Sequence, residues 1–366
     1  MNNSIYVTQP VLPELEDFIP YLEQIWKNKV LTNCGPLHQQ LENELCDYLG
    51  VPYISLFNNG TIALITALQA LNLSEGEVIT TPYTFVATAH SIVWNNLTPV
   101  FVDIDSQTSN IDPEKVELAI TDKTVAILPV HCYGIACDVE RLQNIAAENN
   151  LKLIYDAAHA FGVKYKGQSL LNYGDVSVIS FHATKVFNTF EGGAIVCHSA
   201  EMKQRIDRLK NFGIVNETTI DDISLNGKLS EVHAALGLLQ LKTIDQTLLA
   251  RKQIDINYRE LLGDIDGILC VERSLTETDS YSYFPIIISQ PYPLTRDQLF
   301  EKLKEHNIFA RKYFYPLMTE LNVYKKFDSD TPNAKKLSGQ VLCLPMYPML
   351  SSDQIHRIVD VIKDQL

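Results

Sequence analysis

A lysine and a glycine pair stand close together near the middle of this 366-residue chain: residues 180–185 read SFHATK and residues 191–193 read EGG. Residues 175–181 are expected to form a strand, so Lys185 would lie just beyond its end. Desolvation and cationic neighbours lower the pKa of a lysine, and the free amine then attacks carbonyl carbons. Because most lysines are solvated surface residues, Lys185 alone does not establish a site.

An aspartate follows a second expected strand. Asp156 comes directly after the mostly apolar residues 151–155, and the small residues Ala157 and Ala158 come next. Small residues let a flat ligand approach the backbone, and the carboxylate would suit the protonated ring nitrogen of a pyridine cofactor. Asp156 could equally cap the next helix.

Two more strand ends carry residues of this kind. Residues 58–61 read NNGT between an expected strand and an expected helix, where free N–H groups would favour an anion such as phosphate. Gly60 permits close approach and Thr61 adds a hydroxyl, although an ordinary helix cap would also explain the pattern. Phe85 follows another strand end and could stack on a ring or belong to the core.

Taken together, these residues match one ligand. A phosphate loop, a stacking aromatic, an acid for a ring nitrogen and a lysine for a Schiff base occur in that order along the chain. This combination is what pyridoxal phosphate requires. The sequence therefore predicts a pyridoxal phosphate site.

The surrounding pattern indicates the elements that position these residues. Helices are expected at 14–29 and 38–49, followed by alternating strands and helices; strands are expected at 53–57, 77–80, 100–102, 124–130, 151–155, 175–181 and 193–197, and helices at 61–71, 85–94 and 139–149. Such alternation predicts an α/β fold with a mostly parallel sheet, which binds ligands at the carboxyl ends of its strands. A long helix from residue 229 to about 258 leads into a smaller block. We predict a large domain at 1–245 and a smaller C-terminal domain at 246–366.

Composition excludes several classes of protein. The net charge of −14 argues against a nucleic-acid partner, which usually needs a basic face. The seven cysteines form no CxxC pair, so no metal site is expected, and free thiols suit a reducing cytoplasm. No apolar run approaches the roughly 20 residues of a membrane helix.

The motifs resemble those of the DegT/DnrJ/EryC1/StrS family of sugar aminotransferases. The resemblance runs from the residues LTNCGP at 31–36 to LPMYP at 344–348, and is strongest at SFHATK and EGG. It implies a pyridoxal-phosphate-dependent, aspartate-aminotransferase-like fold of type I, with its central sheet in the large domain. It also implies a homodimer with shared active sites.

The resemblance assigns roles to individual residues. Lys185 matches the lysine that forms the Schiff base and then moves a proton, and Asp156 matches the acid at the ring nitrogen. The other cofactor contacts are expected from Gly60, Thr61, Phe85, His159, Ser180 and Asn226, the last reaching the phosphate in the neighbouring subunit. Lys228 departs from the family pattern, because an arginine is usual there and a lysine cannot make the same bidentate contact.

The resemblance also implies a reaction. Relatives with Phe-His-x-x-Lys mostly aminate C4 of the sugar, which favours conversion of dTDP-4-keto-6-deoxy-D-glucose to dTDP-4-amino-4,6-dideoxy-D-glucose for O-antigen or another glycan. L-glutamate would be the donor, with pyridoxamine phosphate formed on the way. Substrate contacts are expected from Lys29, Lys228, Arg311, Tyr313 and Tyr315. A solvated basic turn over a tyrosine core would explain residues 311–316 equally well. The galacto epimer, another nucleotide sugar and a non-catalytic binding protein remain alternatives.

Overall fold

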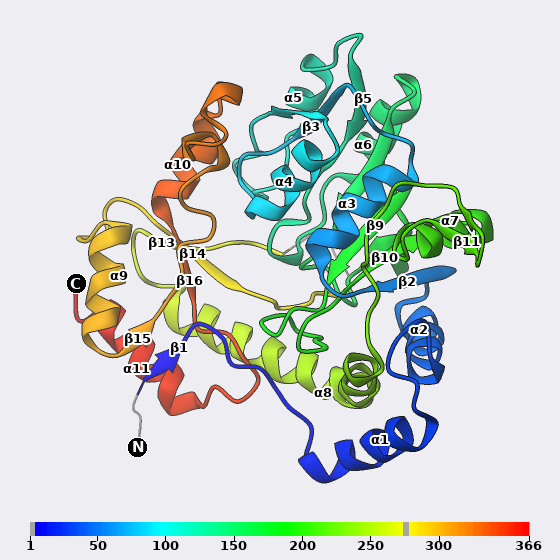
Figure 1. Cartoon of the computed structure of the whole chain (residues 1–366). Helices are drawn as coiled ribbons and strands as arrows, with labels where there is room; N and C mark the ends of the chain where they lie inside the picture. Colours follow the sequence, from blue (N-terminus) through cyan, green and yellow to red (C-terminus); the bar gives the residue numbers. More distant parts are fainter. Residues whose placement is uncertain (1–3, 274–277, 366) are drawn as a thin grey trace.

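A computed structural model describes residues 4–273 and 278–365 of the chain. A seven-stranded sheet forms the centre of the molecule (Figure 1). Its strand order is β2-β10-β9-β6-β5-β3-β4. Only β10 runs antiparallel to its neighbours, and the remaining pairs are parallel. The strands are β2 (Tyr53–Phe57), β3 (Glu77–Thr80), β4 (Thr98–Phe101), β5 (Thr124–Ile127), β6 (Lys152–Asp156), β9 (Val176–Ser180) and β10 (Gly193–Cys197). The predicted α/β class with a mostly parallel central sheet is confirmed.

Helices cover both faces of this sheet, because alternate strand residues are apolar on both sides. Along β6, Leu153 and Tyr155 enter one hydrophobic cluster, whereas Ile154 enters another. The first cluster includes residues of α2 (Pro36–Leu49), α5 (Pro113–Leu118) and α6 (Val139–Glu148). The second includes residues of α3 (Gly60–Ala70), α4 (Val86–Trp94) and α7 (Ala200–Leu209). A sheet buried on both faces leaves only its strand ends open to a ligand.

The long helix α8 (Glu231–Leu262) connects this core to a second one. Ile244 packs in the first core, and Ile254 and Tyr258 pack in the second. The second core lies around an antiparallel sheet in the order β13-β14-β16. Its elements are β13 (Ile268–Cys270), β14 (Phe284–Ile288), α9 (Arg296–Glu305), β15 (Ile308–Phe309), β16 (Val341–Leu344) and α11 (Ser352–Lys363). Helix α10 (Pro332–Gln340) packs instead in a separate cluster, which Ala334 and Leu337 share with Tyr83 and Tyr133.

Strand β1 (Ile5–Tyr6) bears on the domain division. It pairs in parallel with β15, and Ile5 is buried in the second core. We therefore propose the two predicted domains, 1–245 and 246–366, with the amendment that β1 packs with the C-terminal one.

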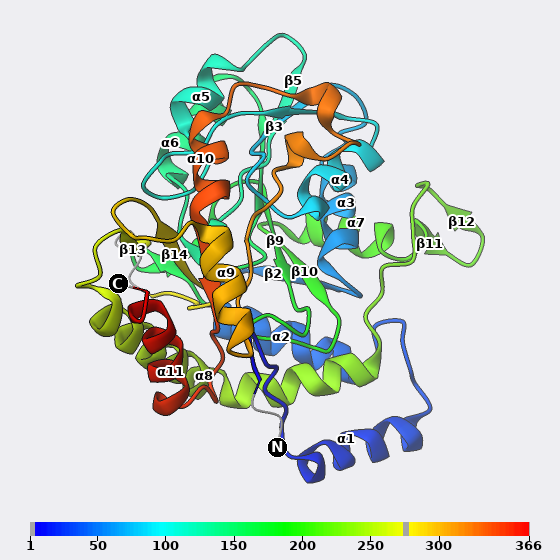
Figure 2. The same ribbon diagram turned by 90° about the vertical axis from the view of Figure 1, so that its left-hand side faces the viewer.

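Two segments protrude from the body of the molecule (Figure 2). One is α1 (Leu15–Asn28), in which Leu15 and Trp26 are exposed. The other is the hairpin of β11 (Ile214–Asn216) and β12 (Thr219–Ile220). A further short hairpin pairs β7 (Lys164–Tyr165) with β8 (Gln168–Ser169). None of the described helices is both long and apolar enough to cross a membrane.

Candidate active site

A cavity of about 430 Å³ opens at the carboxyl ends of the central strands. Tyr283, Arg311, Tyr313 and Phe314, from the C-terminal part of the chain, complete one wall of it. Of the residues predicted for the site, Gly60, Thr61, Phe85, Asp156, His159, Ser180, Lys185, Arg311 and Tyr313 line this cavity. The structure thus brings together most of a set that is spread over 250 residues of sequence, from 60 to 313.

The start of helix α3 forms the anion-binding end of the cavity. The side chain of Asn59 accepts a hydrogen bond from Ile62 N at 2.8 Å and caps the helix. The N–H groups of Gly60 and Thr61 have no acceptor within the helix, because the first turn of a helix leaves them free. Ser180 ends β9 beside Gly60 and adds a hydroxyl to the same wall. A phosphate fits this arrangement of donors.

Gly193 is what allows the loop before α3 to lie so close to β10. A Cβ placed on Gly193 would be 2.7 Å from Gly60 N and 2.8 Å from the carbonyl carbon of Asn59. Both are backbone atoms, so the loop itself would have to move.

We expect Gly193→Ala to weaken pyridoxal phosphate binding and to destabilise the apoprotein by about 1–3 kcal/mol, the usual cost of overpacking. Equilibrium binding and denaturant unfolding would measure the two effects. Gly339→Ala is the matched control, because a Cβ there meets nothing within 4 Å and alanine favours the α10 helix. Unchanged cofactor affinity in Gly193→Ala would show that this close approach is unimportant.

Asp156 lies at the end of β6 and is 5% exposed. Thr88 Oγ1 donates to its Oδ2 at 2.7 Å, and Ala158 N donates to its Oδ1 at 3.1 Å. Burial raises the pKa of this carboxyl group, against the effect of its two hydrogen bonds. No cationic side chain of the described residues lies within salt-bridge distance of it. A buried carboxylate without a cation is costly, so a protonated ring nitrogen would be a fitting partner.

Lys185 faces the same cavity from the loop after β9. Its Nζ donates to Tyr283 Oη at 3.2 Å and lies 5.6 Å from the centre of the tyrosine ring. Burial lowers the pKa of the amine to about 8, although Tyr313 and Asp156 oppose the shift. A much larger share of this amine is therefore neutral near pH 7 than is usual for lysine, as a nucleophile requires.

The lowered pKa predicts the pH dependence of cofactor attachment. Only the neutral amine attacks the cofactor aldehyde, so its reaction rate should rise with pH up to about 8 and then level off. Stopped-flow absorbance of apoprotein mixed with pyridoxal phosphate would measure this rate. A rate that keeps rising towards the ordinary lysine value of 10.5 would contradict the assignment of a depressed pKa.

His159 supplies an unsatisfied polar atom in the same cavity. Its ring lies parallel to Phe314, with ring centres 6.1 Å apart, and meets the edge of Tyr283 at 4.8 Å. Burial, reinforced by the charge of Lys185, holds its pKa well below the ordinary value, so the ring is neutral. Within the described chain, its buried Nδ1 has no hydrogen-bond partner. A hydroxyl on a bound ring would satisfy this atom, and the residues present therefore fit pyridoxal phosphate.

Four predicted residues lie outside this cavity in the single chain. Asn226 is exposed, and its carbonyl accepts from Asn58 Nδ2 at 3.5 Å, beside the phosphate loop. Lys228 Nζ donates to Asn211 Oδ1 at 2.7 Å. Lys29 is exposed at the end of α1, and the Tyr315 ring lies 4.5 Å from the Arg296 guanidinium. Their roles stay predictions, and the role of Asn226 concerns a neighbouring subunit.

Two residues of the site were missed from the sequence. Thr88 holds Asp156 from α4, and its hydroxyl is also 2.8 Å from that of Thr84. Its position one helical turn after Thr84, just beyond a strand end, was an available signal. Tyr283 contacts Lys185 although the two residues are 98 positions apart in the sequence. No local sequence pattern predicts a contact of that kind.

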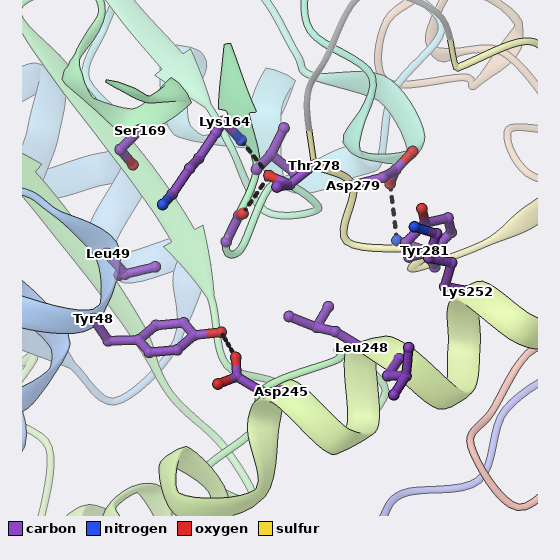
Figure 3. A pocket seen from close by; sticks show the side chains of 13 residues that line it. Tyr48, Leu49, Lys164, Ser169, Asp245, Leu248, Lys252, Thr278, Asp279 and Tyr281 are labelled. Atoms are coloured by element: carbon purple, nitrogen blue, oxygen red, sulfur yellow. Dashed lines mark hydrogen bonds between the residues drawn. The ribbon is translucent and has the colours of Figure 1, made fainter. Parts of the chain in front are cut away.

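A second cavity, of about 370 Å³, lies between α8 and the β7–β8 hairpin (Figure 3). Tyr48 donates to Asp245 Oδ1 across it at 2.7 Å, and Lys164 and Lys252 also line it. It contains none of the residues predicted for catalysis or cofactor binding. The chemistry therefore belongs to the first cavity.

The fold and the first cavity together define a pyridoxal-phosphate-dependent enzyme. The family model of the DegT/DnrJ/EryC1/StrS aminotransferases matches residues 14–363. The chain belongs to this family, and is a pyridoxal-phosphate-dependent aminotransferase.

Individual relatives agree with this placement. The chain is 59% identical to a dTDP-4-amino-4,6-dideoxy-D-glucose transaminase of Shigella dysenteriae, over the full length of both proteins. It is 52% identical to a transaminase of the same name from Escherichia coli, over 99% of this chain and 98% of that one. Among solved structures, DesI in the presence of its TDP-sugar product has a TM-score of 0.95 at 33% identity, covering 99% of this chain and 93% of that one. Streptococcus pneumoniae Spr1654 in its PLP form has a TM-score of 0.91 at 27% identity, covering 99% of this chain and all of that one.

Proposed function

We propose that this enzyme aminates C4 of dTDP-4-keto-6-deoxy-D-glucose, giving dTDP-4-amino-4,6-dideoxy-D-glucose, with L-glutamate as amino donor. The observation that carries the proposal is the cavity that joins Lys185, Asp156 and His159 to the start of α3. The names of the two relatives at 59% and 52% identity support the choice of sugar. Formation of O-antigen or another glycan would be the purpose of such a product.

Pyridoxal phosphate, when bound, supplies an electron sink that makes the amino-acid and sugar carbons acidic. Lys185 holds the cofactor and then accepts and returns a proton at its Nζ, a role for which a pKa of about 8 is suitable. Asp156, fixed by Thr88, keeps the ring nitrogen protonated. We assign the phosphate to Gly60, Thr61 and Ser180, with Asn226 from the partner subunit.

The remaining contacts orient the ring and the sugar nucleotide. Phe85 is 55% exposed in the single chain and lines the cavity, so its ring is free to stack on the cofactor. Arg311 is exposed at the cavity and makes no ion pair among the described residues, which suits a diphosphate. Tyr313 lies under its guanidinium, 5.1 Å from ring centre to cation. Lys29, Lys228 and Tyr315 are proposed as weaker contacts at the rim.

The assembly that we propose is a homodimer with shared active sites. Both protruding segments expose apolar side chains, among them Trp26 of α1 at 72% and Ile220 of β12 at 68%, and Ile223 just after the hairpin is 99% exposed. Exposed apolar patches of this kind mark interaction surfaces. A monomeric mass for the active holoenzyme in sedimentation would contradict the homodimer. We also propose a cytoplasmic location, which seven free thiols support.

The experiment that tests the reaction identifies the product. The holoenzyme is incubated with dTDP-4-keto-6-deoxy-D-glucose and L-glutamate, and the sugar is examined by proton NMR. We expect an amino group at C4 with the large ring couplings of the gluco configuration, together with one 2-oxoglutarate per amino sugar. Small H3–H4 and H4–H5 couplings would show the galacto epimer instead. Faster turnover of a GDP-linked keto-sugar would overturn the choice of nucleotide.

A further inference from the structure

A tyrosine from the C-terminal part of the chain contacts the amine of Lys185 inside the cofactor cavity. Lys185 Nζ donates to Tyr283 Oη at 3.2 Å, and the amine lies 5.6 Å from the centre of the tyrosine ring. Within the described part of the chain, this is the only hydrogen bond that the amine makes. Both residues line the cavity, so the contact lies where the reaction takes place.

Three aromatic rings hold the ring of Tyr283 in one orientation. The distance between ring centres is 4.8 Å to His159, 5.4 Å to Tyr313 and 6.0 Å to Tyr133. All three contacts are edge-to-face, an arrangement that aromatic pairs favour. Rotation of the tyrosine side chain would disturb all of them, so the hydroxyl stays directed at Lys185.

The backbone that carries Tyr283 is fixed to the same wall of the cavity. Ser280 Oγ and Ser282 Oγ both donate to the carbonyl oxygen of His159, at 2.6 and 3.2 Å. The carbonyl of Tyr283 accepts from the guanidinium of Arg273. The segment just before β14 therefore has little freedom to move the phenol away from the amine.

The phenol of Tyr283 is a neutral hydrogen-bond partner. Burial raises its pKa above the ordinary value, and the charges of Arg251 and Arg311 only partly oppose this effect. A neutral oxygen favours the ammonium form of a lysine less strongly than a carboxylate would. Lys185 can thus keep a pKa of about 8 although its amine is hydrogen-bonded.

Other titratable groups also face the amine of Lys185. Burial is the main cause that lowers its pKa, and Tyr313 and Asp156 act in the opposite direction. His159 is neutral, because burial and the charge of Lys185 both lower its pKa. The remaining titratable residues that line the cavity make no hydrogen bond to the amine: His182, Glu191 and Arg311.

We propose that Tyr283 is a further catalytic residue of the transamination, whose hydroxyl holds the Lys185 amine while a proton moves to and from it. This role depends on the function proposed for Lys185. A hydrogen bond from one N–H of the neutral amine to Tyr283 leaves the nitrogen lone pair free to take the proton. Once Nζ has taken it, the same oxygen accepts from the ammonium ion, and the tyrosine ring adds a cation–π contact. The phenol keeps its own proton throughout.

Tyr283→Phe tests the role of the oxygen, because it keeps the ring and its contacts with the neighbouring rings. We expect kcat for 2-oxoglutarate release to fall about tenfold, the scale of one hydrogen bond to a charged group, with a similar KM for glutamate. Tyr48→Phe is the matched control, because its hydroxyl donates to Asp245 outside the cofactor cavity, and it should keep the kcat of the unchanged enzyme. Equal kcat values for Tyr283→Phe and Tyr48→Phe would overturn the proposal.

The second measurement uses the apoprotein and does not depend on turnover. Stopped-flow absorbance gives the rate at which pyridoxal phosphate attaches to Lys185 as a function of pH. Tyr283→Phe removes an acceptor that favours the ammonium form, so its midpoint should lie below that of the unchanged protein, which is expected near pH 8. A midpoint at the same pH would show that the oxygen does not act on the amine. A higher midpoint would show that the hydroxyl donates to the amine instead, and either result would overturn the proposal.

The attachment rates also separate this proposal from the proposed reaction, because they are measured without glutamate or sugar nucleotide. The unchanged enzyme is assayed alongside with dTDP-4-keto-6-deoxy-D-glucose and L-glutamate. Failure to form the amino sugar would count against the proposed reaction alone. A lower midpoint in Tyr283→Phe would still support the role of Tyr283, and an unchanged or higher midpoint would still overturn it.

Discussion

Lys185→Ala should lose transamination activity by at least about three orders of magnitude, the scale on which an enzyme depends on its covalent nucleophile. Two functions disappear with the amine: attachment of the cofactor and transfer of the proton. No other lysine lines the cavity among the described residues, so no neighbouring amine is placed to replace it. Coupled measurement of 2-oxoglutarate release would give the rate.

The same variant should still bind pyridoxal phosphate. The start of α3, Asp156 and His159 line the cavity and are unchanged by the substitution. In the proposed arrangement they would hold the phosphate and the ring rather than the aldehyde. Equilibrium dialysis would detect the bound cofactor. Lys115→Ala is the control, because Lys115 is an exposed lysine of α5, and this variant should keep full activity. A Lys185→Ala enzyme that turned over substrate would remove this lysine from the reaction.

Asp156→Asn should lower the turnover rate by about two to three orders of magnitude, as removal of one preorganised charge partner does. The amide oxygen can still accept from Ala158 N, and its NH2 group can donate to the Thr88 hydroxyl, so the local structure should survive. It cannot hold a proton on the ring nitrogen, because it carries no charge. Steady-state kinetics should show the loss in kcat, with the apoprotein unfolding at a similar temperature.

Thr88→Val is the matched test of positioning. It removes the 2.7 Å hydrogen bond to Asp156 but leaves the carboxylate in place. We expect a loss of about tenfold in kcat, the usual scale of one hydrogen bond to a charged group. A larger loss in kcat from Thr88→Val than from Asp156→Asn would contradict the view that Asp156 acts on the ring and Thr88 only positions it.

The central sheet could be predicted, and so could the position of several candidate residues at its edge, because they come at or just after the end of an expected strand. The roles of His159, Ser180 and Asn226 came from the family resemblance instead. Asp156 ends β6 and Ser180 ends β9, so their positions in the sequence already placed them at one edge of a parallel sheet. The structure also bears on two alternative interpretations. Phe85 is exposed at the cavity rather than buried in the core, and Asn59 both caps α3 and lies in the loop that lines the cavity.

Contacts between distant segments could not be predicted in this way. Tyr283 reaches Lys185 because the segment just before β14 packs beside Tyr133 and His159 at the open strand ends. The pairing of β1 with β15 joins residues some 300 positions apart. A strand of two residues is too short to show the alternation of apolar and polar residues from which a strand is predicted. Helix α7 is different: Ile206 and Leu209 do follow helical spacing, but the segment carries no chemistry and was not assigned.

The absorbance spectrum of the purified holoenzyme, before and after L-glutamate, tests the central claim most directly. We predict a visible band from pyridoxal phosphate linked to Lys185, which glutamate converts to the near-ultraviolet band of pyridoxamine phosphate. The same spectrum of Lys185→Ala should lack the lysine-linked band. A protein that shows no visible band after reconstitution with pyridoxal phosphate, or a band that glutamate leaves unchanged, would contradict the account.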